Sequence, residues 1–206
     1  NDHNSPYSDD INTIFSDSEG MIWLGYSDAF SRFDPTERTF HHYVSNSQSF
    51  PLTGVVGSFA QTPDGAIWAA TQKTGLLRIE PSTNKVSVHA RNENDPSSIV
   101  SNWIISIATD REGNIWLAST NAGVSKYNPT NKIATSFKHS GSDVNSLSSD
   151  QIAEVYIDAD GSIWIATLEG LNLYAPDTDN FIRYTSQNSG LPESFVVSIY
   201  QTREGK

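Results

Sequence analysis

The sequence predicts an all-β fold made of one repeated four-stranded antiparallel unit, and three observations support this prediction. One short pattern occurs four times, as EGMIWLG, DGAIWAA, EGNIWLA and DGSIWIA. The tryptophans of these copies, Trp23, Trp68, Trp116 and Trp164, are separated by 45, 48 and 48 residues. Each copy also holds four short apolar runs bounded by Gly, Pro or Asn, which is typical of strands and turns. Four strands in a period of this length predict the blade of a β-propeller.

The third copy shows how each strand and turn is predicted. Its apolar runs lie at 104–108, 115–118, 124–127 and 133–137. The first turn ends at Gly113, which can adopt the positive φ that closes a hairpin. The second turn ends at Gly123, and Pro129 begins the third, where its locked φ favours a turn. No window has the 3.6-residue spacing of a helix over ten or more residues.

The same turn residues recur in the other copies. The first-turn glycines are Gly20, Gly65, Gly113, Gly161 and Gly205; the second-turn glycines are Gly75, Gly123 and Gly170; the third-turn prolines are Pro35, Pro81, Pro129 and Pro176. Two copies depart from the pattern: Ala29 replaces the second-turn glycine in the first copy, and Thr62 replaces the first-turn aspartate in the second. We expect these changes to affect the local turn geometry and not the fold.

The second run of each copy is apolar on both sides of the strand. It reads Ile-Trp, then an apolar residue, then a small residue at Gly25, Ala70, Ala118 or Ala166. A strand with one solvent-exposed face would alternate apolar and polar residues. This run must therefore be covered on both faces, as in a blade between two other blades, and the small residue lets the neighbouring sheet approach.

The repeats divide the chain at about 11–53, 54–101, 102–149 and 150–193, and 194–206 begins another copy. We therefore expect residues 1–206 to form a partial propeller of four complete blades plus the first strand of a fifth, as part of a larger ring. An open arc would expose an apolar blade face at each end, and such faces attract partners. Two chains are expected to form a homodimer through these open edges.

Composition and charge exclude several classes of function. The 13 basic residues are scattered and the net charge is −11, which argues against binding to a nucleic-acid backbone. Cysteine is absent, so no disulfide, thiolate metal ligand or thiol nucleophile is available. No apolar run reaches about 18 residues, so we expect no membrane contact by this chain. The five histidines lie at the termini or outer strands and do not converge, which predicts no metal site, catalytic residue or cofactor.

Differences among the copies predict a binding face. Alternate turns of a meander lie on the same side, so the second turn and the link into the next unit share one face. Residues that serve only the architecture should be alike in every copy, whereas the residues at this face differ from copy to copy. The ligand-binding candidates are Asp10, Asn102, Trp103, Gln151 and Phe195 where the chain enters an inner strand, and Tyr26, Asp28, Lys73 and Glu169 at second turns. Trp103 is the one tryptophan outside the repeated site, and an aromatic ring beside carboxylate and amide groups suits a sugar ring and its hydroxyls.

Two segments carry a resemblance to a known family. Asp95–Pro129 reads DPSSIVSNWIISIATDREGNIWLASTNAGVSKYNP, and Asn145–Pro176 reads NSLSSDQIAEVYIDADGSIWIATLEGLNLYAP. Both resemble the two-component regulator propeller repeat, with its Ser-Leu-Ser lead-in, D-x-x-G turn, Ile-Trp strand and closing Tyr-x-Pro. The resemblance extends over essentially the whole chain, apart from the departures at Ala29 and Thr62.

The resemblance implies a function. In that family the repeats form the extracytoplasmic, periplasmic sensor of a bacterial membrane signalling protein, whose output domain is a histidine kinase or a diguanylate cyclase. Many members sense carbohydrates, which implies a small-molecule ligand such as an oligosaccharide. This chain carries no output-domain motif, so the resemblance implies a non-enzymatic sensing part. Two alternatives stay open: a scaffold that binds other proteins, and an enzyme similar to streptogramin lyases.

Overall fold

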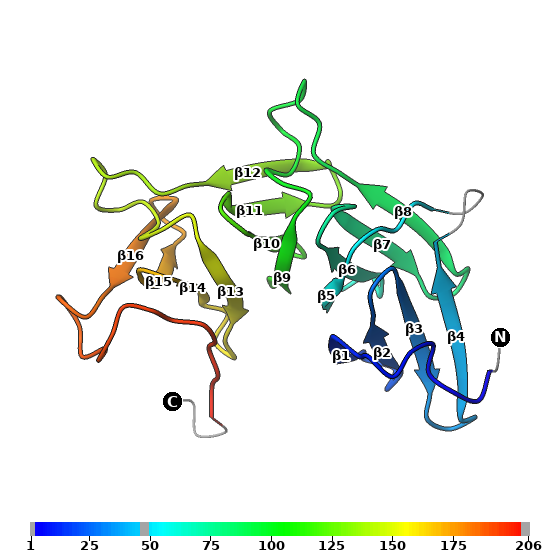
Figure 1. Cartoon of the computed structure of the whole chain (residues 1–206). Coiled ribbons are helices and arrows are strands. Elements are labelled where there is room, and N and C mark those ends of the chain that lie inside the picture. Colours follow the sequence, from blue (N-terminus) through cyan, green and yellow to red (C-terminus); the bar gives the residue numbers. More distant parts are fainter. Residues whose placement is uncertain (1–2, 46–49, 203–206) are drawn as a thin grey trace. The chain divides into compact units, whose positions relative to one another are not determined.

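The computed structural model describes residues 3–45 and 50–202, which form strands and no helix. The strands make four antiparallel four-stranded sheets in which each strand pairs with its neighbour in the chain. This arrangement confirms the prediction of an all-β fold of propeller type (Figure 1). Within the described part of the chain no helical membrane span occurs. The glycine turn predicted at Gly205 lies outside the described residues.

The chain divides into two compact units, and the first comprises residues 1–91 together with 102–104. It contains two sheets. The strands of the first sheet are β1 (Thr13–Ser16), β2 (Ile22–Gly25), β3 (Ala29–Asp34) and β4 (Thr39–Val44). Those of the second are β5 (Val56–Gln61), β6 (Ile67–Thr71), β7 (Leu76–Glu80) and β8 (Lys85–His89).

The second unit comprises residues 92–101 together with 105–206. The strands of the third sheet are β9 (Ile104–Thr109), β10 (Ile115–Ser119), β11 (Gly123–Asn128) and β12 (Ile133–Phe137). Those of the fourth are β13 (Ile152–Ile157), β14 (Ile163–Thr167), β15 (Gly170–Ala175) and β16 (Asn180–Tyr184). Each sheet thus lies within one of the four sequence repeats.

The repeated tryptophan is tied to the first turn of its own sheet. The indole N–H of Trp23 donates to the carboxylate of Asp17, six residues earlier, at 2.8 Å. The same bond joins Trp116 to Asp110 and Trp164 to Asp158, both at 3.0 Å. Because a buried N–H without a partner is costly, this bond allows the indole to lie between sheets. The other carboxylate oxygen of each aspartate accepts backbone N–H groups, which holds the turn closed.

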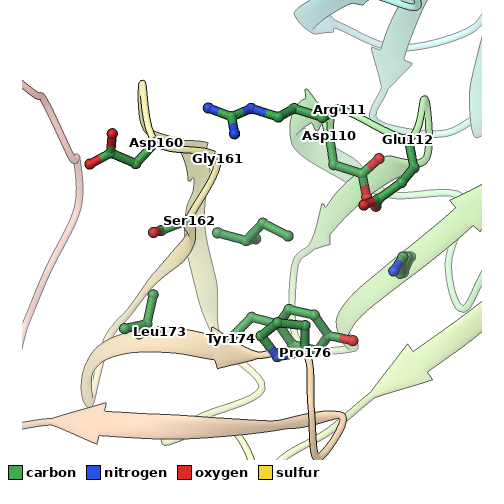
Figure 2. Close-up of a pocket in the computed structure, with 11 residues that line it drawn as sticks. Asp110, Arg111, Glu112, Asp160, Gly161, Ser162, Leu173, Tyr174 and Pro176 are labelled. Carbon is green, nitrogen blue, oxygen red and sulfur yellow. The ribbon is translucent and has the colours of Figure 1, made fainter.

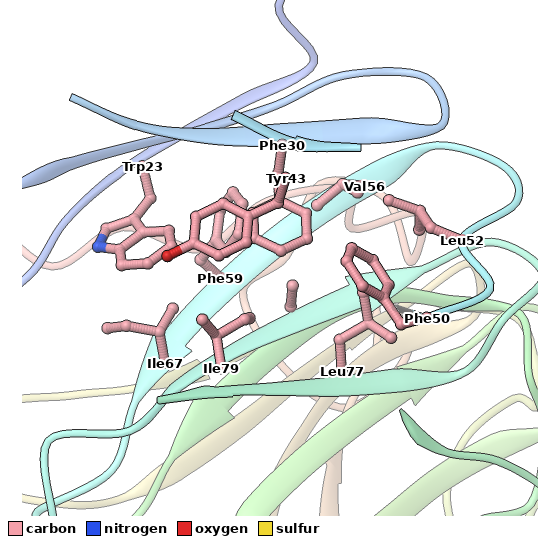
Figure 3. Packing of buried hydrophobic residues seen from close by; sticks show 11 residues of the cluster. Trp23, Phe30, Tyr43, Phe50, Leu52, Val56, Phe59, Ile67, Leu77 and Ile79 are labelled. Carbon is pink, nitrogen blue, oxygen red and sulfur yellow. The ribbon is translucent and has the colours of Figure 1, made fainter. Parts of the chain in front are cut away.

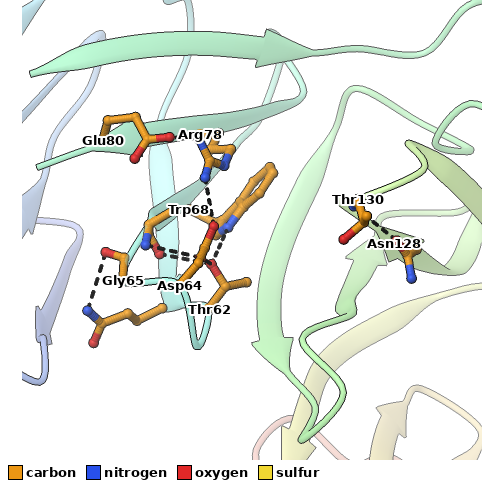
Figure 4. A network of polar contacts seen from close by, with 10 residues as sticks. Thr62, Asp64, Gly65, Trp68, Arg78, Glu80, Asn128 and Thr130 are labelled. Atoms are coloured by element: carbon orange, nitrogen blue, oxygen red, sulfur yellow. Dashed lines mark hydrogen bonds and ion pairs between the residues drawn. The ribbon is translucent and has the colours of Figure 1, made fainter. Parts of the chain in front are cut away.

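The second sheet keeps this arrangement without the aspartate. The hydroxyl of Thr62 accepts the indole N–H of Trp68 at 3.0 Å, and Gly65 takes a positive φ of 84°, close to the values of Gly20, Gly113 and Gly161. Asp64 in the same turn accepts a hydrogen bond from Arg78, whose guanidinium lies 5.7 Å from the Trp68 ring (Figure 4). The turn therefore survives the substitution, because a hydroxyl oxygen accepts one N–H as well as a carboxylate does.

The first sheet also keeps its second turn without glycine. Asp28 adopts the positive φ, 61°, one position before Ala29. Ala29 itself accepts the backbone N–H of Tyr26 at 3.0 Å and is fully buried. Aspartate is among the residues that tolerate this region of φ. The local change in turn geometry expected from the sequence is thus a one-residue shift of the left-handed position.

The core of the first unit lies between its two sheets. Trp23, Phe30 and Tyr43 of the first sheet face Ile67, Leu77 and Ile79 of the second, as Figure 3 shows. The Phe30 and Tyr43 rings stack at 4.5 Å, and Trp23 stacks on Tyr43 at 5.8 Å. Burial raises the pKa of Tyr43 to about 12, against a smaller lowering by Arg32, and its hydroxyl donates to Asn84 at 2.7 Å. The expectation that neighbouring sheets cover the indole is met here.

The second unit repeats this packing. Trp116 of the third sheet stacks on Phe137 at 5.7 Å and meets Tyr174 of the fourth sheet edge to face at 4.7 Å. Phe181 and Ile165 of the fourth sheet complete the cluster. Each offset or edge-to-face aromatic pair of this kind stabilises the fold by about 0.5–1.5 kcal/mol, in addition to the stabilisation from removing apolar area from water. The two units therefore depend on the same kind of contact.

The fourth tryptophan differs from the other three. Trp23, Trp68 and Trp116 are fully buried, whereas Trp164 is half-buried. Trp164 lines a hollow of about 230 Å³ together with Leu171, Ile199 and Tyr200. Its sheet face is thus covered by a single segment of chain and not by a second sheet.

That segment corrects one expectation. Residues 195–200, predicted as the first strand of a fifth blade, form no strand in the structure. Every other first strand pairs with the second strand of its own sheet, and no such strand is present for this segment among the described residues. It is held by two bonds to the fourth sheet: Val196 N–H donates to the Thr167 carbonyl at 3.1 Å, and Ile199 N–H donates to the Glu154 carboxylate at 2.6 Å.

The links that lead into the first, third and fourth sheets follow one pattern. The backbone N–H of Phe40 in β4 donates to the carbonyl of His3 at 2.7 Å. The same bond joins Ala134 in β12 to Ser97 at 2.7 Å, and Phe181 in β16 to Asn145 at 2.8 Å. In the first, third and fourth sheets the incoming link is therefore fixed to the outer strand of the sheet that it enters, although the two are far apart in the sequence.

The sheets consequently have two different ends. We call the end that carries the first and third turns the turn end, and the end where the second turn meets a link the variable end. Backbone bonds define the variable end: Val56 N–H donates to the Tyr26 carbonyl at 2.9 Å, and Leu168 N–H to the Gln151 carbonyl at 3.1 Å. At the turn end, Asn128 of the third turn donates to Asn114 of the first turn at 3.0 Å.

The bond between the indole and the first turn can be tested at Asp110. We expect Asp110→Ala to lower the free energy of unfolding by about 2–3 kcal/mol, because it leaves the buried N–H groups of Trp116 and Asn114 without an acceptor. Asp110→Thr should recover most of this loss, as Thr62 does in the second sheet. Urea denaturation measures both values, with Glu112→Ala in the same turn as the control. An equal loss for the alanine and threonine variants would contradict the interpretation.

The turn of the fourth sheet predicts a pH dependence. Burial alone would raise the pKa of Asp158, but hydrogen bonds from the Trp164 indole and from backbone N–H groups outweigh it and lower the pKa below its ordinary value. A lowered folded-state pKa gives stability that is present above about pH 4 and is lost as the pH falls through the folded value. We expect Asp158→Asn to reduce the fall in urea midpoint between pH 5 and pH 2. Asp160→Asn, at a carboxylate that accepts no hydrogen bond from the described residues, should leave that fall unchanged.

Candidate functional site

The variable end contains all the residues that the sequence predicts to bind a ligand, and the structure gives them three different roles. One is buried in the core, two hold the backbone in place, and the others are exposed.

Tyr26 is the buried member of the set. Its side chain has no exposed surface and packs with Leu24 and Ala29, while the Tyr7 ring lies 5.7 Å away. Its hydroxyl is buried without a hydrogen-bond partner. The sequence places Tyr26 at the surface because it stands in a turn; the structure places it in the core because the ring folds back over its own sheet. Tyr26 therefore offers no contact to a ligand at the surface.

Asp28 and Asn102 hold the backbone. The Asp28 carboxylate accepts the N–H of Gly54 at 2.5 Å, which joins the second turn to the link. The Asn102 side chain accepts the N–H of Arg91 at 2.6 Å, and its carbonyl accepts the N–H of Gly75 at 3.2 Å. These bonds give both side chains a structural role.

The third repeat shows that the role of Asn102 is general. Asp150 occupies the corresponding place in the next link, where its carboxylate accepts the N–H of His139 at 2.7 Å and its carbonyl accepts the N–H of Gly123 at 3.2 Å. An amide and a carboxylate thus perform the same task in different copies. Variation between copies at this position therefore does not mean freedom from the architecture.

Asp10, Lys73 and Trp103 are the exposed candidates of the first unit. Trp103 is 46 % exposed and follows Asn102 directly, so the bond between Asn102 and Gly75 brings its backbone beside the turn that carries Lys73. The alkyl stem of Lys73 lies against Gly54, which leaves its ammonium at the surface. Asp10 is exposed just before β1. This end of the first unit thus presents an aromatic ring, a cation and an anion.

Gln151, Glu169 and Phe195 are the exposed candidates of the second unit, and backbone bonds bring them to one end of the fourth sheet. The Gln151 carbonyl accepts the N–H of Leu168, next to Glu169. Val196, next to Phe195, donates to Thr167 at 3.1 Å. Phe195 is 57 % exposed, and the side chains of Gln151 and Glu169 are exposed as well. This end presents an aromatic ring, an amide and a carboxylate.

The turn end carries clefts that the sequence reasoning missed. A cleft of about 350 Å³ in the second unit lies between the first turns of the third and fourth sheets, with Lys126, Ile163 and Tyr174 among its walls (Figure 2). A cleft of about 260 Å³ occupies the corresponding place in the first unit, with Arg32 and Glu80 among its walls. The cleft of the second unit is just above the lower limit for small-molecule sites, about 300 Å³, and that of the first unit is below it.

Both clefts contain a cation that stands opposite a tryptophan. In the strand register, Arg32 pairs with Trp23, Arg78 with Trp68 and Lys126 with Trp116, whereas Leu173 pairs with Trp164. The signal was present in the sequence, since a basic residue follows each of the first three tryptophans by nine or ten positions. The turns at this end are nearly constant among the copies, which predicts a purely structural role and hides this signal.

No metal centre is formed by the part of the chain that the structure describes. Nowhere in residues 3–45 and 50–202 do three or more His, Asp or Glu side chains gather closely enough to hold a metal ion. The turn carboxylates Asp17, Asp110 and Asp158 are instead occupied by N–H donors of their own turns and indoles.

Comparison with known proteins supports the sequence resemblance. The sequence model of the two component regulator propeller family matches residues 98–121, which run from the end of a link through Trp116 to the second turn. The resemblance inferred from Asp95–Pro129 is thereby confirmed. A comparison with curated protein sequences gave no significant match.

Solved structures show the same fold at low sequence identity. One is the extracellular domain of BT3049 from B. thetaiotaomicron, described as a hybrid two component system; it is 21 % identical over 95 % of this chain and 31 % of that chain, with a TM-score of 0.54. Another is PorZ of Porphyromonas gingivalis, a surface component of the type-IX secretion system; it is 18 % identical over 97 % of this chain and 30 % of that chain, with a TM-score of 0.72.

An enzyme is also among the similar structures. Virginiamycin B lyase from Staphylococcus aureus is 14 % identical over 84 % of this chain and 55 % of that chain, with a TM-score of 0.61. At these identities the similarity concerns the fold alone. The present chain spans less than a third of the length of the first two proteins and about half of the lyase. These structures share the propeller fold with this chain, and the sequence match at residues 98–121 is to the two component regulator propeller family.

The separation of structural from exposed residues at the variable end can be tested with two variants. We expect Asn102→Ala to lower the free energy of unfolding by about 1 kcal/mol, because the N–H of Arg91 loses its acceptor. Gln151→Ala should change it by less than about 0.5 kcal/mol, because the exposed amide of Gln151 makes no side-chain hydrogen bond in the described structure. Urea denaturation measures both. Equal stability of the two variants would remove the structural role assigned to Asn102.

Proposed function

We propose that this propeller of two component regulator type is the ligand-sensing part of a bacterial membrane signalling protein. It lies on the periplasmic side of the membrane and passes a ligand-induced change to an output domain, a histidine kinase or a diguanylate cyclase. The family match at residues 98–121 and the fold shared with an extracellular domain support this assignment.

The observation that carries the proposal is the contrast between the two ends of the sheets. The first-turn aspartates at the turn end are bound to their own indoles and backbone. At the variable end each unit instead exposes an aromatic ring together with polar groups: Trp103 with Asp10 and Lys73, and Phe195 with Gln151 and Glu169.

The chemistry of these groups favours a sugar. The face of a sugar ring carries C–H groups that pack on an aromatic ring. Its hydroxyls donate hydrogen bonds to carboxylates and both donate to and accept from amides. Each unit supplies one such ring and at least one such acceptor. We therefore propose an oligosaccharide as the ligand class, with Trp103 and Phe195 as the stacking residues.

Thermal denaturation in the presence of a panel of oligosaccharides tests this proposal. We expect at least one sugar to raise the Tm, and Trp103→Ala to weaken its binding about fivefold or more, which corresponds to about 1 kcal/mol of lost stacking. Tyr200→Ala is the matched control, because Tyr200 is 80 % exposed but lies on the face of the fourth sheet and not at the variable end. A panel without any effect on the Tm would contradict sugar sensing, as would equal binding by the Trp103→Ala variant.

A further inference from the structure

The cleft of the second unit contains a cation whose charge has no partner. The ammonium of Lys126 lies 5.5 Å from the Trp116 ring centre and 5.7 Å from that of Tyr174. Among the described residues it makes neither an ion pair nor a hydrogen bond, in contrast to Arg78, which pairs with Asp64 and Glu80. The two aromatic rings hold the lysine stem in place and lower the cost of the exposed charge.

The other polar groups of the cleft divide into occupied and free ones. Arg111 reaches across to the first turn of the fourth sheet, where it donates to the Ala159 carbonyl at 2.7 Å (Figure 2). Asp110 accepts the indole N–H of Trp116 and the N–H of Asn114. The carboxylates of Glu112 and Asp160 accept no hydrogen bond from the described residues and lie at the exposed rim. The free groups are thus one ammonium and two carboxylates.

The remaining walls of the cleft are apolar. Ile163, Leu173 and Pro176 line it, and Tyr174 forms part of its wall, with its hydroxyl turned to Asp179 at 2.5 Å. Leu173 is the residue that replaces the cation found opposite the other three tryptophans. Because leucine and not a basic residue stands at this position, this wall of the cleft is apolar.

We propose that this cleft binds a small zwitterion, an α-amino acid with an apolar side chain. The ligand carboxylate pairs with Lys126, its ammonium pairs with Glu112 or Asp160, and its side chain packs on Ile163, Leu173 and Pro176. A simple anion would meet two free carboxylates, and a simple cation would meet Lys126, whereas a zwitterion satisfies both signs. The volume of about 350 Å³ suits a molecule of this size. This site is at the turn end, so it is separate from the sugar site proposed above.

Titration of the whole chain with L-leucine, followed by the NMR signal of the Trp116 indole N–H, tests the site. We expect saturable binding at millimolar concentration, weakened by added salt because the charged groups are partly exposed. Lys126→Met keeps an unbranched apolar side chain on the rings and removes the charge, so it should weaken binding at least tenfold. Lys138→Met, at an exposed lysine of the same unit outside the cleft, should bind leucine as the unchanged protein does.

Two fragments of leucine test the zwitterion without any substitution. 4-Methylpentanoate lacks the ammonium and 3-methylbutylamine lacks the carboxylate, and each should bind at least tenfold more weakly than leucine. Three results would overturn the proposal: equal binding of either fragment, full retention of binding by Lys126→Met, or no response to leucine up to about 50 mM. The last would mean a binding free energy weaker than roughly −2 kcal/mol. None of these results depends on the outcome with oligosaccharides.

Discussion

The hydrogen bond between each repeated indole and its own first turn is the interaction on which the rest of the structure depends. It occurs in all four sheets at 2.8–3.0 Å, with aspartate as acceptor in three of them and Thr62 in the second. An indole has one polar atom, and satisfying it at the edge of the sheet leaves the whole ring free to lie against the next sheet. This bond therefore holds the hairpin closed and requires an acceptor six residues before the tryptophan. It also leaves the apolar ring available for packing against the neighbouring sheet. The spacing of the turn and the strand is constant for this reason.

Packing between sheets then decides how a repeated residue is used. Phe59 and Val155 stand nine residues before a repeated tryptophan, and their side chains are 6 % and 3 % exposed. Each belongs to the second sheet of its unit and packs against the first sheet of that unit. Ile14 has the same place in the first sheet and is 67 % exposed. Trp164 likewise is half-buried, although its turn and strand are formed as in the other copies. Local structure is thus a property of the single repeat, whereas burial is a property of a pair of sheets.

The candidate site shows the same division between what repeats and what varies. Comparison of the copies selects Trp103, Gln151 and Phe195, which are exposed at the variable end, because side chains at this end are not shared by every sheet. It cannot distinguish these from Asn102, whose bonds to Arg91 and Gly75 are matched by those of Asp150 with a different side chain. It also cannot show that the ring of Tyr26 turns inward. Whether two different side chains make the same hydrogen bonds, and which way a side chain points, depends on the positions of other segments. A comparison of residue identities among the copies reveals neither.

The sequence alone determined the all-β class, the four-stranded repeat, the places of the turns and the resemblance to two-component regulator propellers, because these follow from local spacing of apolar residues, glycine and proline. The tertiary structure alone decided which tryptophans are fully covered, why 195–200 forms no strand, and that Lys126 lies over rings from two different sheets. Each of the latter needs residues separated by about one repeat or more to meet. A strand pattern specifies which faces are apolar, but only the neighbouring sheet decides what those faces contact.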